Sequence, residues 1–99
     1  MLNSRQRAQL RGLANGFEPL VHIGKGGVTE TLIAQAEEII AVRELVKCRV
    51  LETAGLTSRQ AADTVAEAIG ADVVQVIGSC FILYRVAVEK EDRKIVLVK

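Results

Sequence analysis

The sequence predicts an α/β fold, a single compact domain with a mixed sheet of about four strands packed by three helices. Three observations support this class. Segments 29–42 and 57–69 have helical spacing of apolar residues and recognisable capping residues. Segment 45–51 alternates between apolar and polar residues, as a strand with one solvated face does. Segments 72–77 and 80–88 are apolar runs joined by two residues, a hairpin pattern. A shorter helix and strand precede them, so the order is helix, strand, helix, strand, helix, strand, strand.

The chain begins with a predicted helix over residues 4–14, which Asn3 or Ser4 can cap. Its apolar residues form a stripe that we expect to be buried: Leu10, Leu13 and Ala14. Gly16 ends this helix, and residues 20–23 follow as a short buried strand.

The second predicted helix and the strand after it each have one apolar side. The helix core face consists of Leu32, Ala36, Ile39 and Ile40. In the strand, Val46, Cys48 and Val50 face the core. Lys47 and Arg49 face the other way, where they either solubilise an exposed surface or extend a basic one.

The third predicted helix has the best-defined ends. Residues 57–60 fit a capping box, and Gly70 suits the C-cap. Gly78 and Ser79 form the turn of the following hairpin. The core of the single domain 1–99 therefore spans about residues 4–88, and 89–99 form a charged C-terminal tail whose residues 95–98 either add a short strand or extend freely.

Composition limits the classes of function. The hydrophobic content of 49% and the charged content of 25% indicate a chain that folds. Because no apolar run approaches a membrane span and no apolar signal region follows the N-terminus, we expect a cytoplasmic protein without a membrane partner. Cys48 and Cys80 lie far apart with only His22 as another soft ligand, so we expect buried reduced thiols, no metal site and no cofactor.

The chain is organised around a glycine-rich stretch, Gly24, Lys25, Gly26 and Gly27, between the first strand and the second helix. Thr29 can cap that helix, whose N-terminus suits a phosphate. A P-loop is excluded because no Ser or Thr follows Lys25 directly, and the dinucleotide-binding G-x-G-x-x-G pattern fails at Thr29. The remaining G-x-x-G spacing is the one with which KH domains clamp a nucleic-acid backbone; alternatively it is a plain turn with a solvated lysine. Gly26 is expected to make this loop flexible, which adds an entropic cost to binding.

Several further motifs occur in a fixed order around this stretch. They are Leu10-Arg11-x-Leu13-Ala14, Pro19-Leu20-Val21-x-Ile23-Gly24-Lys25-x-Gly27-Val28-Thr29-Glu30, Glu44-Leu45-Val46-Lys47, Val74-Gln75-Val76-Ile77-Gly78 and Leu83-Tyr84-Arg85. This series closely resembles the CRM domain, the RNA-binding domain of chloroplast splicing factors and of bacterial stand-alone proteins of the YhbY type. The resemblance covers about residues 5–85. It implies an architecture similar to the C-terminal domain of bacterial translation initiation factor three.

The resemblance implies a non-catalytic RNA-binding protein that associates with ribosomal RNA or precursor large-subunit particles in ribosome assembly. The candidate RNA-binding residues are Gly24, Lys25, Gly26, Gly27, Arg7, Arg11, Thr29, His22, Lys47 and Arg85. Arg7 and Arg11 share one helix face, and the resemblance implies that this helix flanks the glycine loop. Four of these candidates also have ordinary structural interpretations: a solvated helix face for Arg7 and Arg11, a sheet-edge residue for His22 and an acid partner for Arg85.

Two alternatives to RNA binding differ in class. The net charge of +1 is low for a nucleic-acid binder and favours a protein-interaction module that docks on a ribosomal protein or an assembly GTPase. An enzyme is disfavoured because the sequence has one histidine, no metal-ligand cluster and no nucleophile motif. We expect no DNA partner, because no helix is rich in base-reading residues, and we expect a monomer.

Overall fold

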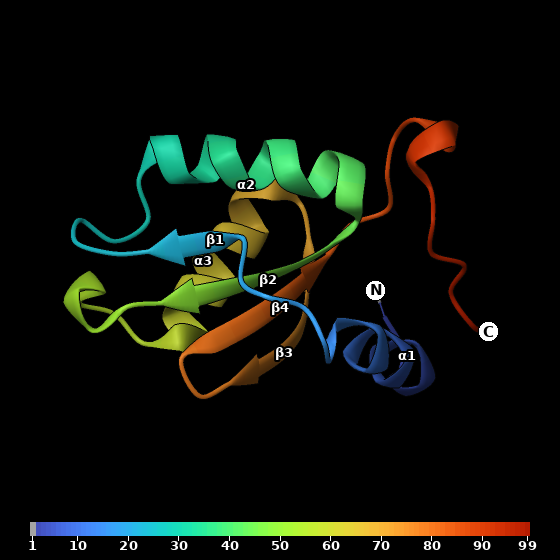
Figure 1. The fold of residues 1–99 in the computed structure, drawn as a ribbon, viewed down its shortest axis with the longest axis horizontal. Coiled ribbons are helices and arrows are strands. Elements are labelled where there is room, and N and C mark those ends of the chain that lie inside the picture. The colour runs from blue at the N-terminus through green and yellow to red at the C-terminus, as the bar shows by residue number, and fades with distance from the viewer. Residues whose placement is uncertain (1) are drawn as a thin grey trace.

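The computed structural model describes residues 2–99, and these form one four-stranded sheet with helices against both of its faces (Figure 1). The helices are α1 (Ser4–Ala14), α2 (Glu30–Arg43) and α3 (Ser58–Ile69). The strands are β1 (Val21–Ile23), β2 (Leu45–Val50), β3 (Asp72–Ile77) and β4 (Cys80–Tyr84). Two single turns of 3₁₀ helix, η1 (Glu52–Ala54) and η2 (Lys90–Asp92), complete the described elements. The predicted fold class and element order are confirmed.

The sheet is mixed, with the strand order β1-β2-β4-β3. β1 and β2 are parallel and are connected through α2, whereas β2 with β4 and β3 with β4 are antiparallel. These directions bring three connections to one end of the sheet: the glycine loop after β1, the segment after β2 and the turn between β3 and β4. Two backbone hydrogen bonds join them, from Leu51 N to Ile23 O (2.8 Å) and from Val50 N to Ser79 O (2.7 Å). We refer to this end as the loop end.

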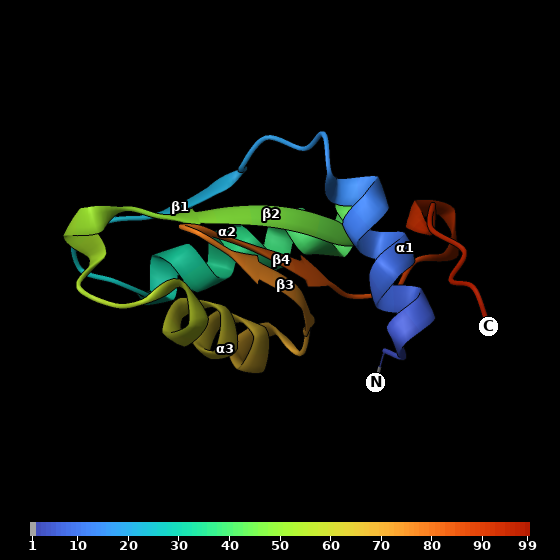
Figure 2. The same cartoon turned by 90° about the horizontal axis from the view of Figure 1, so that it is seen from below.

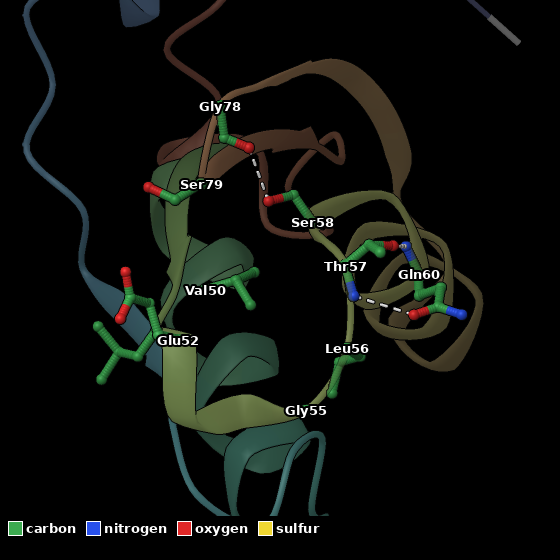
Figure 3. Close-up of a pocket in the computed structure, with 10 residues that line it drawn as sticks. Val50, Glu52, Gly55, Leu56, Thr57, Ser58, Gln60, Gly78 and Ser79 are labelled. Atoms are coloured by element: carbon green, nitrogen blue, oxygen red, sulfur yellow. Dashed lines mark hydrogen bonds between the residues drawn. The ribbon is translucent and has the colours of Figure 1, made fainter.

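Capping residues fix the helix boundaries. Thr57 and Gln60 form the predicted capping box of α3, in which Gln60 Oε1 accepts from Thr57 N at 2.9 Å (Figure 3). Gly70 ends the helix at a φ of +66°, a left-handed conformation that favours glycine. Asn3, rather than Ser4, caps α1 and forms a second capping box with Gln6.

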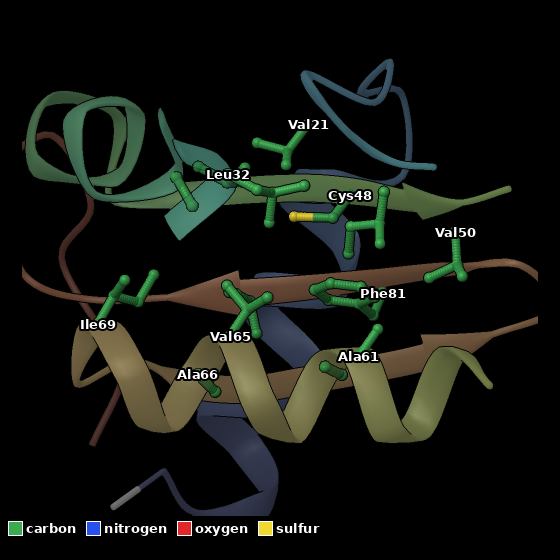
Figure 4. Packing of buried hydrophobic residues seen from close by; sticks show 14 of the residues in the cluster. Val21, Leu32, Cys48, Val50, Ala61, Val65, Ala66, Ile69 and Phe81 are labelled. Atoms are coloured by element: carbon green, nitrogen blue, oxygen red, sulfur yellow. The ribbon is translucent and has the colours of Figure 1, made fainter. Parts of the chain in front are cut away.

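The larger core lies between the sheet and the two helices on one face, α2 and α3 (Figure 4). Alternation along the strands selects the inward side chains. Val46 and Cys48 of β2 pair with Leu83 and Phe81 of β4, and Val50 lies in the same core. Small alanines of α3 (Ala61, Ala62 and Ala66) allow that helix to approach the sheet closely. Ala68 of the same helix, by contrast, is exposed and takes no part in this contact.

A smaller core lies on the opposite face of the sheet, beneath α1 (Figure 2). Leu10 and Ala14 of α1 pack there with Leu45, Ile82 and Tyr84. The expectation that Leu13 belongs to the buried stripe is wrong, since its side chain is 47% exposed. The helix rotates Leu10 and Ala14, which are four residues apart, directly onto the sheet and leaves Leu13 at the margin of that contact.

The C-terminal tail neither forms a strand nor extends freely. The chain leaves β4 after Tyr84, earlier than predicted, and the tail runs beside α1 (Figure 2). Gln9 donates to Val96 O (2.8 Å) and accepts from Val98 N (2.9 Å), while Gln6 Nε2 donates to Val98 O (2.9 Å). Side chains of α1 therefore form the hydrogen bonds with the tail backbone that a neighbouring strand would otherwise form. Ile95 and Leu97 of the tail pack against the smaller core.

Candidate nucleic-acid interface

The glycine loop is a closed turn at the loop end of the sheet. Gly27 N donates to Gly24 O at 3.0 Å, so Lys25 and Gly26 occupy the two central positions. Gly26 has a φ of +98° and Gly27 a φ of +68°, values that side chains rarely permit. Lys25 is exposed at the tip. The turn therefore presents one cation, Lys25, on a backbone that favours glycine at the two positions after it.

The loop leads into a helix whose first amides are free. Thr29 caps α2, its hydroxyl accepting from Leu32 N at 3.2 Å, as predicted. Within residues 2–99, the amides of Lys25, Gly26 and residues 28–31 donate to no protein acceptor. Together with the positive end of the dipole of α2, these donors form a surface suited to an anion. The exposed carboxylate of Glu30 in the first turn limits how far along the helix a phosphate can lie.

The segment after β2 supports the loop from behind. A Cβ on Gly24 would lie 3.5 Å from the Leu51 side chain, and a Cβ on Gly27 would lie 3.1 Å from Leu56 Cδ2. Gly27 is thus required both for its backbone conformation and for the space that Leu56 occupies. The Leu51 and Leu56 side chains therefore lie directly behind the turn. The flexibility expected from Gly26 stays a prediction.

Cationic residues continue from the loop onto the open half of the sheet. His22 of β1 is paired in register with Arg49 of β2, and both side chains are exposed. Lys47 is half-buried on the same face, two residues before Arg49. Arg49 is absent from the candidate RNA-binding residues, although its alternation with Lys47 places it on the solvated face. Because α1 covers only the other half of this face, these side chains adjoin the loop end.

Arg7 and Arg11 lie elsewhere. The expectation that the first helix flanks the glycine loop is wrong, because α1 packs at the opposite end of the sheet (Figure 1). Its contacts there include Leu45, the first residue of a strand that runs toward the loop. Arg7 also donates a hydrogen bond to Val73 O. These two arginines therefore cannot form one continuous site with Lys25.

Arg85 has an acid partner. Its guanidinium forms two hydrogen bonds with the Glu37 carboxylate, one of them 2.9 Å long, and donates to Ile69 O at 2.8 Å. The hydrogen bonds from Arg85 hold the pKa of Glu37 below its ordinary value. The side chain thus links β4 to α2 and α3, and its charge is neutralised within the fold.

The two cysteine thiols lie on opposite faces of the sheet. Burial, with a smaller contribution from Cys80, raises the pKa of the Cys48 thiol to about 12. Both cysteines are free: Cys48 faces the larger core, while Cys80 is paired with Arg49 on the opposite face. Within residues 2–99, no three His, Cys, Asp or Glu side chains gather to hold a metal ion. Over the same residues, no helix has the length and apolar character needed to cross a membrane.

These features define a small α/β domain with a glycine loop of free amides and a partly open, cationic sheet face. The family model described as the CRS1 / YhbY (CRM) domain matches residues 2–85, and the chain belongs to this family. The resemblance found in the sequence motifs is thereby confirmed.

Individual relatives match nearly the whole chain. It is 33% identical to the "Probable RNA-binding protein YqeI" of Bacillus subtilis, over 98% of this chain and 99% of the relative. It is 32% identical to an "RNA-binding protein" of Haemophilus influenzae, over 85% of both chains. Among solved structures, the solution structure of the hypothetical protein SAV1595 from Staphylococcus aureus superposes with a TM-score of 0.75 at 34% identity, covering 96% of this chain and 99% of that one.

Proposed function

We propose that this protein is a non-catalytic RNA-binding protein whose glycine loop contacts the phosphate backbone. The observation that carries the proposal is the group of free amides around Lys25 at the N-terminus of α2. Membership of the CRM family and the names of the relatives support RNA as the ligand. Backbone contacts of this kind position a nucleic acid without reading its sequence.

The contact surface extends from the loop across the open half of the sheet. Lys25, Lys47 and Arg49 supply three cations, and His22 supplies a polar side chain beside Arg49. Three neutralised phosphates correspond to a salt slope of about −2 in a logarithmic plot of affinity against salt. This is a small value, and it is consistent with the net charge of +1. Arg7, Arg11 and Arg85 are not part of this surface.

The resemblance to stand-alone CRM proteins extends the proposal to a particular RNA. Large-subunit ribosomal RNA, or the precursor particle that contains it, is the proposed ligand, and the protein would act as a cytoplasmic monomer in ribosome assembly. A large particle offers additional contacts, which compensates for a modest electrostatic contribution from this small domain.

Fluorescence anisotropy with large-subunit ribosomal RNA fragments and matched duplex DNA, at low and moderate salt, tests the proposal. We expect preferential binding of RNA that weakens as salt is raised. Lys25→Gln should weaken binding and reduce the salt slope by about one. Lys90→Gln, an exposed lysine of η2 in the tail, is the matched control and should leave both unchanged. Gly26 should be kept, because a side chain at a φ of +98° would distort the turn.

An unchanged salt slope in a folded Lys25→Gln variant would remove the loop from the interface. Absence of binding to naked RNA at both salt concentrations would contradict the proposal in its simple form. That result would favour the alternative function, a protein-interaction module, and one structural feature also supports this alternative. A hollow of about 250 Å³ at the end opposite the loop is lined by Leu13, Phe17, Arg43, Leu45, Lys94 and Ile95. Leu13 and Phe17 are 47% and 41% exposed there.

A further inference from the structure

A second hollow opens beside the glycine loop, at the loop end of the sheet. It has a volume of about 540 Å³ and is bounded by the segment after β2, the first turn of α3 and the turn between β3 and β4 (Figure 3). Val50 lies at its base, with Gly55 and Leu56 on one side and Gly78 on the other. It is shallow and open to solvent, so it can receive a flat group against its wall but does not enclose one.

The hollow and the glycine loop share a wall. Leu51 and Leu56, which line the hollow, are the side chains that approach Gly24 and Gly27 from behind. A single layer of side chains therefore lies between the hollow and the backbone of the glycine loop. A nucleotide whose phosphate lies on the loop can place its own base, or that of a neighbour, at the hollow.

The lining of the hollow suits a neutral, partly polar group. Glu52 is its only charged residue, and the Glu52 carboxylate points away from the hollow in Figure 3. A phosphate would find no cation there. Ser58 Oγ donates to Gly78 O at 2.8 Å, which ties α3 to the turn between β3 and β4. Both oxygens keep a free lone pair, so they can accept hydrogen bonds from a ligand N–H.

We propose that this hollow receives one unstacked base of a single-stranded RNA whose backbone lies on the glycine loop. Every RNA base offers at least one N–H group along its pairing edge, the complement of the Ser58 and Gly78 oxygens. The base plane would pack over Val50 and Leu56. This inference rests on the proposed RNA-binding function and adds a base-binding subsite to a backbone contact. It explains how a domain with few cations gains affinity for single strands.

The test compares a single-stranded RNA octamer of mixed sequence with an octamer of the same backbone whose four central bases are removed. The wild-type chain should bind the complete octamer roughly tenfold more tightly, because one packed base contributes a factor of this size. The amide signals of Gly55, Ser58 and Gly78 should shift in NMR spectra with the complete octamer only. The amide signal of Lys25 should shift with both octamers.

A pair of substitutions at one position separates filling of the hollow from loss of a hydrogen bond. Ser58→Leu adds bulk inside the hollow, whereas Ser58→Ala removes the same hydroxyl without adding bulk. Neither removes the helix cap, which is Thr57. The preference for the complete octamer should fall toward one in Ser58→Leu and be only partly reduced in Ser58→Ala, which keeps the Gly78 oxygen as an acceptor and leaves the hollow open; both variants should be folded by circular dichroism.

The outcomes distinguish this inference from the function on which it rests. Equal affinity of the wild-type chain for the two octamers, with a shift of the Lys25 amide, would overturn the base subsite and leave backbone binding in place. Shifts of the hollow amides with the base-free octamer would also overturn it. Failure to bind either octamer would overturn both the subsite and the proposed RNA-binding function.

Discussion

Glu44 is the buried anchor of the C-terminal tail, and its replacement by glutamine should release that tail. The residue is fully buried and has a φ of +65°, the only positive φ of a non-glycine residue among residues 2–99. Its Oε2 accepts from Ala87 N (2.9 Å), and its Oε1 accepts from Lys94 N (2.7 Å) and Ile95 N (3.1 Å). One carboxylate thus satisfies three backbone donors from a segment more than 40 residues away.

The magnitude follows from these three bonds. In Glu44→Gln the remaining oxygen can still accept from Lys94 and Ile95, but the amide NH₂ would face the Ala87 N–H. An unsatisfied buried donor costs about 1–3 kcal/mol, and each retained bond loses about 1 kcal/mol when its acceptor becomes neutral. The free energy of tail release should therefore fall by about 3–5 kcal/mol.

Hydrogen exchange measured by NMR is the direct assay, because the tail can open without global unfolding. The amides of Ala87, Lys94 and Ile95 should exchange at least roughly a hundredfold faster in Glu44→Gln, because about 3 kcal/mol, the lower end of this range, already corresponds to that factor. Glu38→Gln, on the exposed side of α2, is the control and should leave these rates unchanged. Equal protection of the three amides in Glu44→Gln and the wild type would refute the assignment of Glu44 as the anchor.

The same contact predicts a pH dependence. Burial raises the pKa of Glu44, but the three N–H donors and nearby Arg93 lower it by more, so the net pKa lies below the ordinary 4.5. Stability from this carboxylate is therefore fully present above pH 4.5 and is lost as the pH falls through the lower pKa of the folded state. Tail protection in the wild type should decrease in that acidic range, and Glu44→Gln should lack this contribution.

Two further predictions concern the loop glycines and the thiols. Gly27→Ala should lower the free energy of unfolding by about 1–2 kcal/mol, because its φ of +68° is left-handed and its Cβ would crowd Leu56. Gly24→Ala should change it by less than about 0.5 kcal/mol in the same urea titration, and equal losses would contradict the loop geometry. A thiol reagent at pH 8 should label Cys80 while Cys48 stays unmodified, since burial raises the pKa of Cys48 to about 12. Equal labelling of both in the folded protein would refute this.

Helix ends and turns are the features that the sequence predicts best, because their causes are local. The capping box at Thr57 and Gln60, the C-cap at Gly70 and the turn at Gly78 each depend on residues within four positions of one another. The glycine loop belongs to the same class. A local pattern can be recognised without knowledge of the rest of the chain.

Placement of α1 and of the tail depends on distant residues and could not be predicted in the same way. The spacing of Leu10 and Ala14 shows that α1 buries a face, but it does not show which end of the sheet receives that face. Glu44 gives no local signal either. A glycine at this position would have indicated a left-handed backbone conformation, whereas a glutamate is expected at the exposed end of a helix.

Cations present a related difficulty at the candidate site. A sequence shows that Arg7 and Arg85 carry charge, but it does not show which acceptor each one meets. In the folded chain these acceptors are Val73 O for Arg7, and Glu37 and Ile69 O for Arg85. Arg49, by contrast, is exposed on the open sheet face. The difference depends on contacts made across the fold, so residue type alone cannot separate structural from ligand-binding arginines.

The arrangement of the loop has a consequence for the energetics of binding. An unrestrained glycine-rich segment would lose much conformational entropy when it orders around a phosphate. Here the Gly24–Gly27 hydrogen bond and the support from Leu51 and Leu56 already define the turn, and Thr29 fixes the start of α2. The entropy of ordering the loop is thus lost on folding, where the burial of the larger core offsets it. For the proposed phosphate contact, preorganisation of this kind would give tighter binding by the few amides and one lysine than a flexible loop of the same composition would give.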